Sequence, residues 1–236
     1  MIPLSAGIRT RRVPWVTYTL IAVNAIVFLF ELALGRQVSG ILMTLGAVPA
    51  KITDPAGYPF AAATLFTSIF LHGGWTHLIG NMLYLGIFGG NVEDVLGYAG
   101  YSVFYIAAGV LAGLAQVAVA PAAQVPAIGA SGAIAGVLAV YLVLYPTAPV
   151  RALVPLGFFI RVVRVPAVLV LGMWFIVQLF NGAASFGVQT MSTGDVAWFA
   201  HIGGFVFGLI VGAIARVSSR RRRLPPTPWD YRRREW

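Results

Sequence analysis

The sequence contains no cysteine and few charged residues. Without cysteine among its 236 residues, the chain has no disulfide bonds, no thiol catalysis and no cysteine-based metal site. Charged residues make up 10% of the chain, whereas a typical soluble domain has about 25%. Hydrophobic residues make up 59%. This balance excludes an ordinary soluble domain and indicates an integral membrane protein.

Long apolar segments recur along most of the chain. A helix needs about 20 apolar residues to cross a bilayer. We therefore expect an all-α, polytopic membrane protein with a six-helix bundle over residues 15–216, an N-terminal segment at 1–14 and a basic tail at 217–236. The expected spans are 15–34, 71–88, 98–119, 134–145, 165–179 and 196–214. The fourth reaches full length only if the preceding "GASG" belongs to it.

Acidic residues are scarcer than basic ones, with 7 against 16, and the basic residues are unevenly placed. If the N-terminus is inside, every Lys and Arg except Arg36 and Lys51 falls in an inside segment. The positive-inside rule then predicts a multi-pass protein with cytoplasmic termini. A short N-terminal segment without a transit peptide favours a bacterial plasma (inner) membrane. The net charge of +9 reflects this asymmetry. We therefore expect the lipid bilayer, and no nucleic acid, as the partner of the basic tail.

Polar side chains are rare at membrane depth, where they are costly and tend to be functional. The chain has three histidines, His72, His77 and His201. With the expected topology, His77, Asn81, Ser131 and His201 come from three different spans. At 1.5 Å of rise per residue, all four lie in the outer half of the membrane. This shared depth predicts one polar site.

Small residues indicate how two of these spans approach each other. Gly132 and Gly136 lie four residues apart in the fourth span, and Gly204 belongs to a four-residue repeat of small residues in the sixth. Such faces let helix backbones pack closely. Close packing would bring Ser131 within hydrogen-bond reach of His201.

The four polar residues suit nucleophilic catalysis. A serine hydroxyl needs a base such as histidine to take its proton, and the attacked carbonyl needs donors for its developing negative charge. Ser131 opens a helix, where backbone N–H groups are free. His77 and Asn81, at i and i+4, share one helix face and can add donors. Because no Asp or Glu lies at the depth of His201, we expect a Ser–His dyad, with backbone or packing orienting the imidazole.

At this point the motifs resemble a known family. "GASG" with Ser131, "HGGWTHLIGNM" with His77 and Asn81, and "AHIGGFVFG" with His201 resemble the rhomboid intramembrane serine proteases over residues 14–216. The resemblance implies a six-helix core and a catalytic dyad of Ser131 and His201. It also implies oxyanion contacts from Asn81, His77 and the Ser131 N–H. The implied substrates are single-pass or polytopic membrane proteins, cut near the outer membrane surface.

One further motif matches the family pattern, and two positions depart from it. Glu93 and Gly97 in "GGNVEDVLG" resemble the family's Glu-x-x-x-Gly, which we interpret as structural, as we do Gly132 and Gly204. Many members carry an aromatic residue four positions after the nucleophile, stacked on the catalytic histidine, but this chain has Ala135. The Trp-Arg pair common in the family's first outer loop is also absent.

Several alternatives remain open. His72 suits a structural hydrogen-bonding role near the membrane edge better than an auxiliary catalytic one. Three histidines without HExxH or a carboxylate ligand do not predict a metal site, and we expect no cofactor. The alternative function is a non-catalytic rhomboid-like module that binds or chaperones membrane proteins, although such relatives lack the serine or the histidine. A transporter would need carboxylate relays, which the spans lack.

Overall fold

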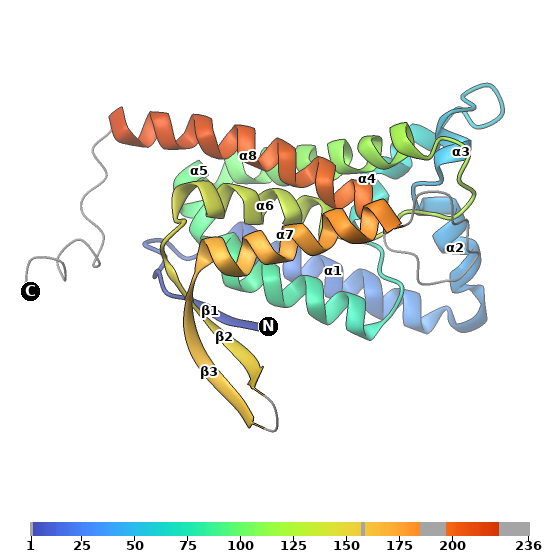
Figure 1. Cartoon of the computed structure of the whole chain (residues 1–236). Helices are drawn as coiled ribbons and strands as arrows, with labels where there is room; N and C mark the ends of the chain where they lie inside the picture. Colours follow the sequence, from blue (N-terminus) through green and yellow to red (C-terminus); the bar gives the residue numbers. More distant parts are fainter. Residues whose placement is uncertain (1, 157–158, 185–196, 222–236) are drawn as a thin grey trace, which may run out of the picture.

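The computed structural model describes residues 2–156, 159–184 and 197–221. Within them the chain is mostly helical, with a small sheet at one end of the helix bundle (Figure 1). The long helices are α1 (Trp15–Ala33), α5 (Trp75–Val119), α6 (Ser131–Leu144), α7 (Ala167–Ala184) and α8 (Trp198–Arg221). Short helical segments connect α1 to α5, namely η1 (Gly35–Gln37), α2 (Val38–Leu45), α3 (Pro49–Ile52), η2 (Ala61–Ala63), α4 (Thr64–Thr67) and η3 (Ser68–Phe70).

Helix α5 consists of two arms that meet at a break. Gly97 there has φ 72° and ψ 165°, a backbone conformation outside the helical region. Glycine adopts such a positive φ without the steric cost that a Cβ brings. The break separates the two segments for which the sequence predicted separate spans.

Three helices among the described residues are long and apolar enough to cross a membrane: α1, α5 and, over Trp198–Ser218, α8. Helices α6 and α7 are also apolar, but their apolar portions are shorter. Length and composition therefore support a multi-pass membrane protein, and the count of six spans stays a prediction.

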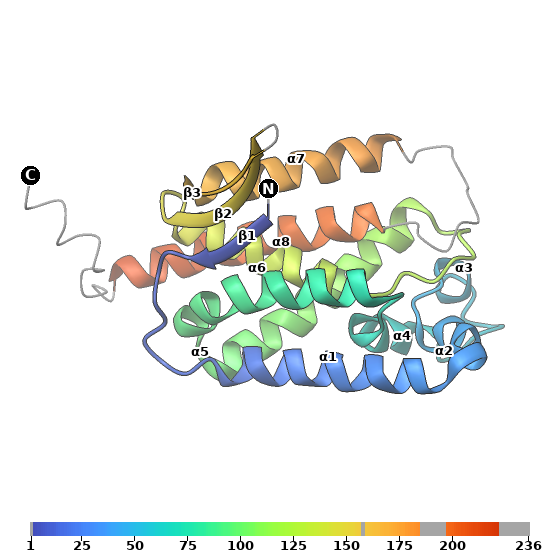
Figure 2. The same cartoon turned by 90° about the horizontal axis from the view of Figure 1, so that it is seen from below.

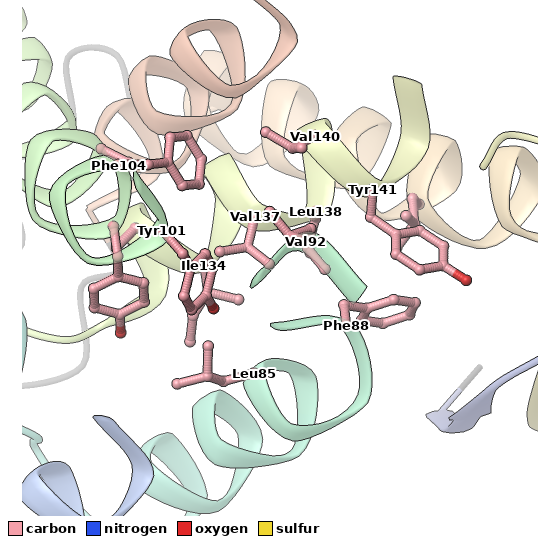
Figure 3. Close-up of a cluster of buried hydrophobic side chains, with 14 of the residues drawn as sticks. Leu85, Phe88, Val92, Tyr101, Phe104, Ile134, Val137, Leu138, Val140 and Tyr141 are labelled. Atoms are coloured by element: carbon pink, nitrogen blue, oxygen red, sulfur yellow. The ribbon is translucent and has the colours of Figure 1, made fainter. Parts of the chain in front are cut away.

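Helix α6 is the centre of the bundle. Every residue from Gly132 to Tyr141 is buried, and α6 packs against both α5 and α8. Figure 2 shows α1 and α7 at opposite edges of the bundle, with α6 between them. The core joins apolar side chains of α6 to both arms of α5 (Figure 3), among them Leu85, Phe88, Val92, Tyr101, Phe104, Ile134, Val137, Leu138, Val140 and Tyr141. A helix that is apolar on all sides suits this position.

Two acidic residues of α5 hold the N-terminal end of α1. The buried Glu93 carboxylate accepts hydrogen bonds from the Val16 N–H at 2.9 Å, the Thr17 N–H at 2.8 Å and the Thr17 hydroxyl at 2.7 Å. Asp94 accepts from the N–H of Arg11 at 2.5 Å and of Arg12 at 3.1 Å. Backbone N–H groups at a helix start have no intrahelical acceptor, and negative charge is favourable there. The pair thereby ties α1 to α5.

The sheet corrects the all-α prediction. Strands β1 (Ile2–Ala6), β2 (Pro149–Leu156) and β3 (Phe159–Pro166) form an antiparallel sheet in the order β1-β2-β3. The arginine-containing segment between the fourth and fifth spans was expected only as an inside connection. Its many valines favour extended backbone, and pairing leaves Val150 and Ala152 fully buried. The protein is therefore mostly helical with a three-stranded sheet.

Candidate active site

Glycines bring α6 and α8 into backbone contact. A Cβ on Gly204 would overlap the carbonyl oxygen of Gly132, and a Cβ on Gly208 would overlap that of Gly136. Since a Cβ cannot occupy the space of a carbonyl oxygen, no larger residue fits at either position without moving the helices apart. The two helices thus approach as closely as their backbones allow, within one turn of Ser131 and His201.

Ser131 and His201 meet at this helix contact. Ser131 is the first residue of α6, and His201 lies in the first turn of α8. The Ser131 Oγ is 2.7 Å from the His201 Nε2. On the other side of the ring, Nδ1 is 2.7 Å from the Oε1 of Gln178 in α7. The imidazole is therefore buried and hydrogen-bonded at both nitrogens.

The residues before Ser131 are fixed by backbone hydrogen bonds. Ala127 pairs with Ala47 in an isolated antiparallel bridge, and the Gly129 N–H donates to the Ser68 carbonyl at 2.8 Å. Gly129 has φ +117°, which a residue with a Cβ rarely adopts. The first hydrogen bond of α6 runs from the Ile134 N–H to the Ala130 carbonyl. The Ser131 N–H is therefore left without an intrahelical acceptor.

His77 and Asn81 of α5 lie beside this segment. A Cβ on Gly129 would be 2.6 Å from the His77 Nε2, which is too close, and 3.7 Å from the Asn81 Nδ2, which is ordinary contact. Glycine at this position therefore lets the His77 ring lie against the backbone. The Asn81 amide nitrogen is buried and has no hydrogen-bond partner among the described residues. An unsatisfied buried donor costs about 1–3 kcal/mol. The described structure therefore holds an unpaired donor beside Gly129, two residues before Ser131.

His72 lies in the turn before α5, and its ring centroid is 5.1 Å from that of His77. Its backbone N–H donates to the carboxylate of Glu31 in α1, at 3.2 and 3.3 Å from the two oxygens. Its Nδ1 is 3.3 Å from the Phe70 carbonyl oxygen. His72 thus connects α1 to the loop before α5, and it has no hydrogen bond with Ser131 or His201 in the described structure. Within the described ranges, no three His, Asp or Glu side chains are grouped as metal ligands.

Comparison with known proteins decides the family. A model of the rhomboid domain matches residues 59–218, a range that includes Ser131, His201, His77 and Asn81. The chain belongs to the rhomboid family. The resemblance drawn from the sequence motifs is thereby confirmed.

Two curated rhomboid relatives match parts of the chain. Rhomboid-like protein 11, chloroplastic, of Arabidopsis thaliana is 32% identical over 163 residues, which is 66% of this chain and 52% of that protein. Putative rhomboid protease YdcA of Bacillus subtilis (strain 168) is 37% identical over 78 residues, 33% of this chain and 39% of that protein. The chain thus spans about half or less of the length of the curated relatives it matches.

The sequence analysis missed one residue of this rhomboid site. Gln178 is the only side chain with an amide or charge between Ala167 and Phe180, and it is buried against His201. A lone polar residue in an apolar helix was an available signal. Trp174, one turn earlier on the same helix face, has its ring centroid 5.8 Å from that of His201.

Proposed function

We propose that this rhomboid protein is an intramembrane serine endopeptidase that cleaves transmembrane segments of membrane proteins. The observation that carries the proposal is the 2.7 Å separation between the Ser131 Oγ and the His201 Nε2. A nucleophile and its base need this separation for proton transfer. Both groups lie at the contact of two apolar helices, and polar groups at membrane depth are costly and tend to be functional.

In this mechanism Ser131 is the nucleophile and His201 the general base. The Ser131 oxygen attacks the scissile carbonyl carbon while its proton passes to the His201 Nε2. The tetrahedral intermediate then expels the leaving amine, which takes that proton from His201, and an acyl-enzyme remains. Water then attacks the ester carbonyl while His201 takes its proton. The second tetrahedral intermediate breaks its bond to the Ser131 oxygen, which receives that proton from His201, and the carboxylic acid product leaves. His201 is therefore positively charged in each tetrahedral intermediate and neutral again when that intermediate collapses.

The oxyanion is held by the donors that surround Ser131. These are the Ser131 N–H at the start of α6, the Asn81 amide and the His77 ring. The unpaired amide nitrogen of Asn81 supports this assignment, because a preorganised donor is useful only if an acceptor arrives during the reaction. Gly129 supports it too, since its missing side chain leaves space for the His77 ring two residues before the nucleophile.

The topology of the proposal has six spans, the two arms of α5 counting as separate ones, and both termini in the cytoplasm. The dyad then lies in the outer half of the membrane. A substrate helix must unwind to expose its scissile bond, and irregular backbone at this depth requires a water-filled or protein-lined place. The distribution of the basic residues supports the cytoplasmic location of both termini in this proposal.

The alternative is a non-catalytic rhomboid-like protein that binds membrane-protein clients. Such a protein has no need for the serine and histidine to keep a hydrogen-bonded geometry. The 2.7 Å pair therefore favours the protease.

Two measurements on purified protein test the proposal. A fluorophosphonate probe should label wild-type protein and the Ser102→Ala control, which removes a half-buried serine that donates to the Tyr98 carbonyl. It should not label Ser131→Ala. A fluorescent transmembrane substrate in proteoliposomes should be cut by wild type and not by Ser131→Ala or His201→Ala. If wild type and Ser131→Ala behave alike in both assays, the protein is not a serine protease and the client-binding alternative takes its place.

A further inference from the structure

Gln178 is the group that completes the hydrogen bonding of His201. It lies on α7, which forms one edge of the bundle (Figure 2), whereas His201 lies on α8 and Ser131 on α6. Its Oε1 is 2.7 Å from Nδ1, and the two side chains are each 6% exposed. Most neighbours of Gln178 on α7 are exposed apolar residues, including Ile176, Val177 and Leu179. A single carboxamide therefore points inward from a helix whose outer face is apolar.

The geometry defines which ring nitrogen carries the hydrogen. A carboxamide oxygen has no hydrogen to donate, so Nδ1 of His201 must donate to the Gln178 Oε1. In a neutral imidazole the other nitrogen, Nε2, then has a free lone pair. That lone pair faces the Ser131 hydroxyl, which donates to it at 2.7 Å. This is the tautomer in which His201 can accept a proton from Ser131.

We propose that Gln178 is a positioning residue for the catalytic dyad, which it serves by fixing the tautomer and ring orientation of His201 from a third helix. The inference rests on the proposed protease function and adds a residue to it. When Ser131 gives up its proton, positive charge develops on the imidazole, and the Gln178 oxygen accepts a stronger, charge-assisted hydrogen bond from Nδ1. A neutral amide thus takes a position that a carboxylate takes in many serine proteases.

Aromatic rings cover the rest of the His201 ring. The Trp174 ring is tilted by 40° at 5.8 Å, and the Trp198 ring packs edge-on at 6.0 Å, both measured between ring centroids. Trp174 and Gln178 lie four residues apart on one face of α7, so a single helix supplies both a ring contact and the hydrogen-bond acceptor. Position 135, where the family pattern has an aromatic, is a fully buried alanine. Support for the histidine therefore comes from α7 and α8 rather than from α6.

Three substitutions separate the position of the oxygen from polarity and packing. Gln178→Leu keeps the approximate volume and removes the acceptor. Gln178→Asn keeps the amide on a side chain one methylene shorter, which moves the oxygen away from Nδ1. Gln178→Glu keeps an oxygen at the same reach. Gln116→Leu is the matched control, because Gln116 is a half-buried glutamine of α5 whose Oε1 has no partner among the described residues.

The assay is steady-state cleavage of a transmembrane substrate in proteoliposomes, with wild type and Ser131→Ala in parallel. We expect Gln178→Leu and Gln178→Asn to lower kcat about 10- to 100-fold, part of the roughly 10²- to 10⁴-fold that general acid–base catalysis supplies. The KM should stay within about twofold, because an interaction made with the base acts on the chemical step. Gln178→Glu should restore kcat to within about threefold of wild type, since the acceptor remains. Gln116→Leu should retain wild-type kcat.

The outcomes distinguish this inference from the proposed function. If wild type cleaves, Ser131→Ala does not and Gln178→Leu retains full kcat, the positioning role is wrong while the protease stands. An effect on KM alone, or a Gln178→Glu variant as slow as Gln178→Leu, also overturns it. If Gln178→Leu does not fold, the comparison of Gln178→Asn with Gln178→Glu decides. If wild type is as inactive as Ser131→Ala, both the function and the inference fail.

Discussion

The contact between Gly204 and Gly132 provides a sharp test of how the fold sets the dyad. Substituting Gly204→Ala adds one methyl group, which would overlap the Gly132 carbonyl oxygen in the present structure. That oxygen belongs to helix backbone and cannot rotate away. Helices α6 and α8 must therefore move apart at the point where Ser131 and His201 meet.

The magnitude follows from the geometry. To regain a carbon–oxygen spacing near 3.5 Å, the helices must separate by about 1 Å or more. The Ser131–His201 distance of 2.7 Å would then exceed hydrogen-bond length. A displacement of about 1 Å at reacting groups lowers the rate roughly 100-fold, and overpacking lowers the free energy of unfolding by about 1–3 kcal/mol. We expect a protein that still folds but cleaves about 100-fold more slowly.

Gly204→Ala is measured by substrate cleavage, by fluorophosphonate labelling and by thermal unfolding in detergent. Two other glycine variants are controls in the same three measurements. Gly172→Ala on α7 has no atom within 4 Å of the new Cβ and should match wild type. Gly212→Ala on α8 places its Cβ 3.0 Å from the Val143 Cβ, far along the helix from His201. It should lower stability without a comparable loss of rate. Wild-type cleavage by Gly204→Ala, or equal activity losses in Gly204→Ala and Gly212→Ala, would refute the reasoning.

Further predictions concern the oxyanion donors and the ends of the helices. Asn81→Ala should lower kcat about 10²- to 10³-fold, the usual effect of losing one oxyanion donor, while Ser131 is still labelled slowly by the probe; a wild-type kcat would exclude Asn81 from the oxyanion site. Glu93→Gln should lower the free energy of unfolding by about 1–3 kcal/mol, because an amide accepts fewer of the three hydrogen bonds from Val16 and Thr17. Its kcat per folded molecule should equal that of wild type. Gly97→Ala should cost about 1–3 kcal/mol, since its φ of 72° strains a residue with a Cβ; unchanged thermal unfolding would argue against a strained break.

The sequence predicted those features whose signal lies within a continuous stretch of residues. Apolar length indicated a multi-pass membrane protein, and the three motifs identified the rhomboid family, because both signals lie in contiguous residues. The four-residue spacing of small residues pointed to the α6–α8 contact for the same reason. The count of six spans stays a prediction, because α5 is one long apolar helix with a break at a single glycine.

The small sheet was not predicted, because its stability depends on pairing between distant segments. Strand β1 pairs with β2, and helices α1 to α6 lie between these two strands in the sequence. The valines and arginines of β2 and β3 are compatible with a basic connection as well as with a strand. Strand propensity depends on what the side chains pack against.

The amino-acid sequence by itself determined which residues can react and which family the chain belongs to, because chemical type and motif spacing are local properties. Tertiary structure alone decided what surrounds His201. Gln178 lies 23 residues before it on another helix, and its contact with Nδ1 depends on how α7 packs against α8. Gly129 likewise acquires its role only because His77 and Asn81 lie against it. Contacts between helices depend on crossing angle and depth, which no periodicity within a single helix specifies.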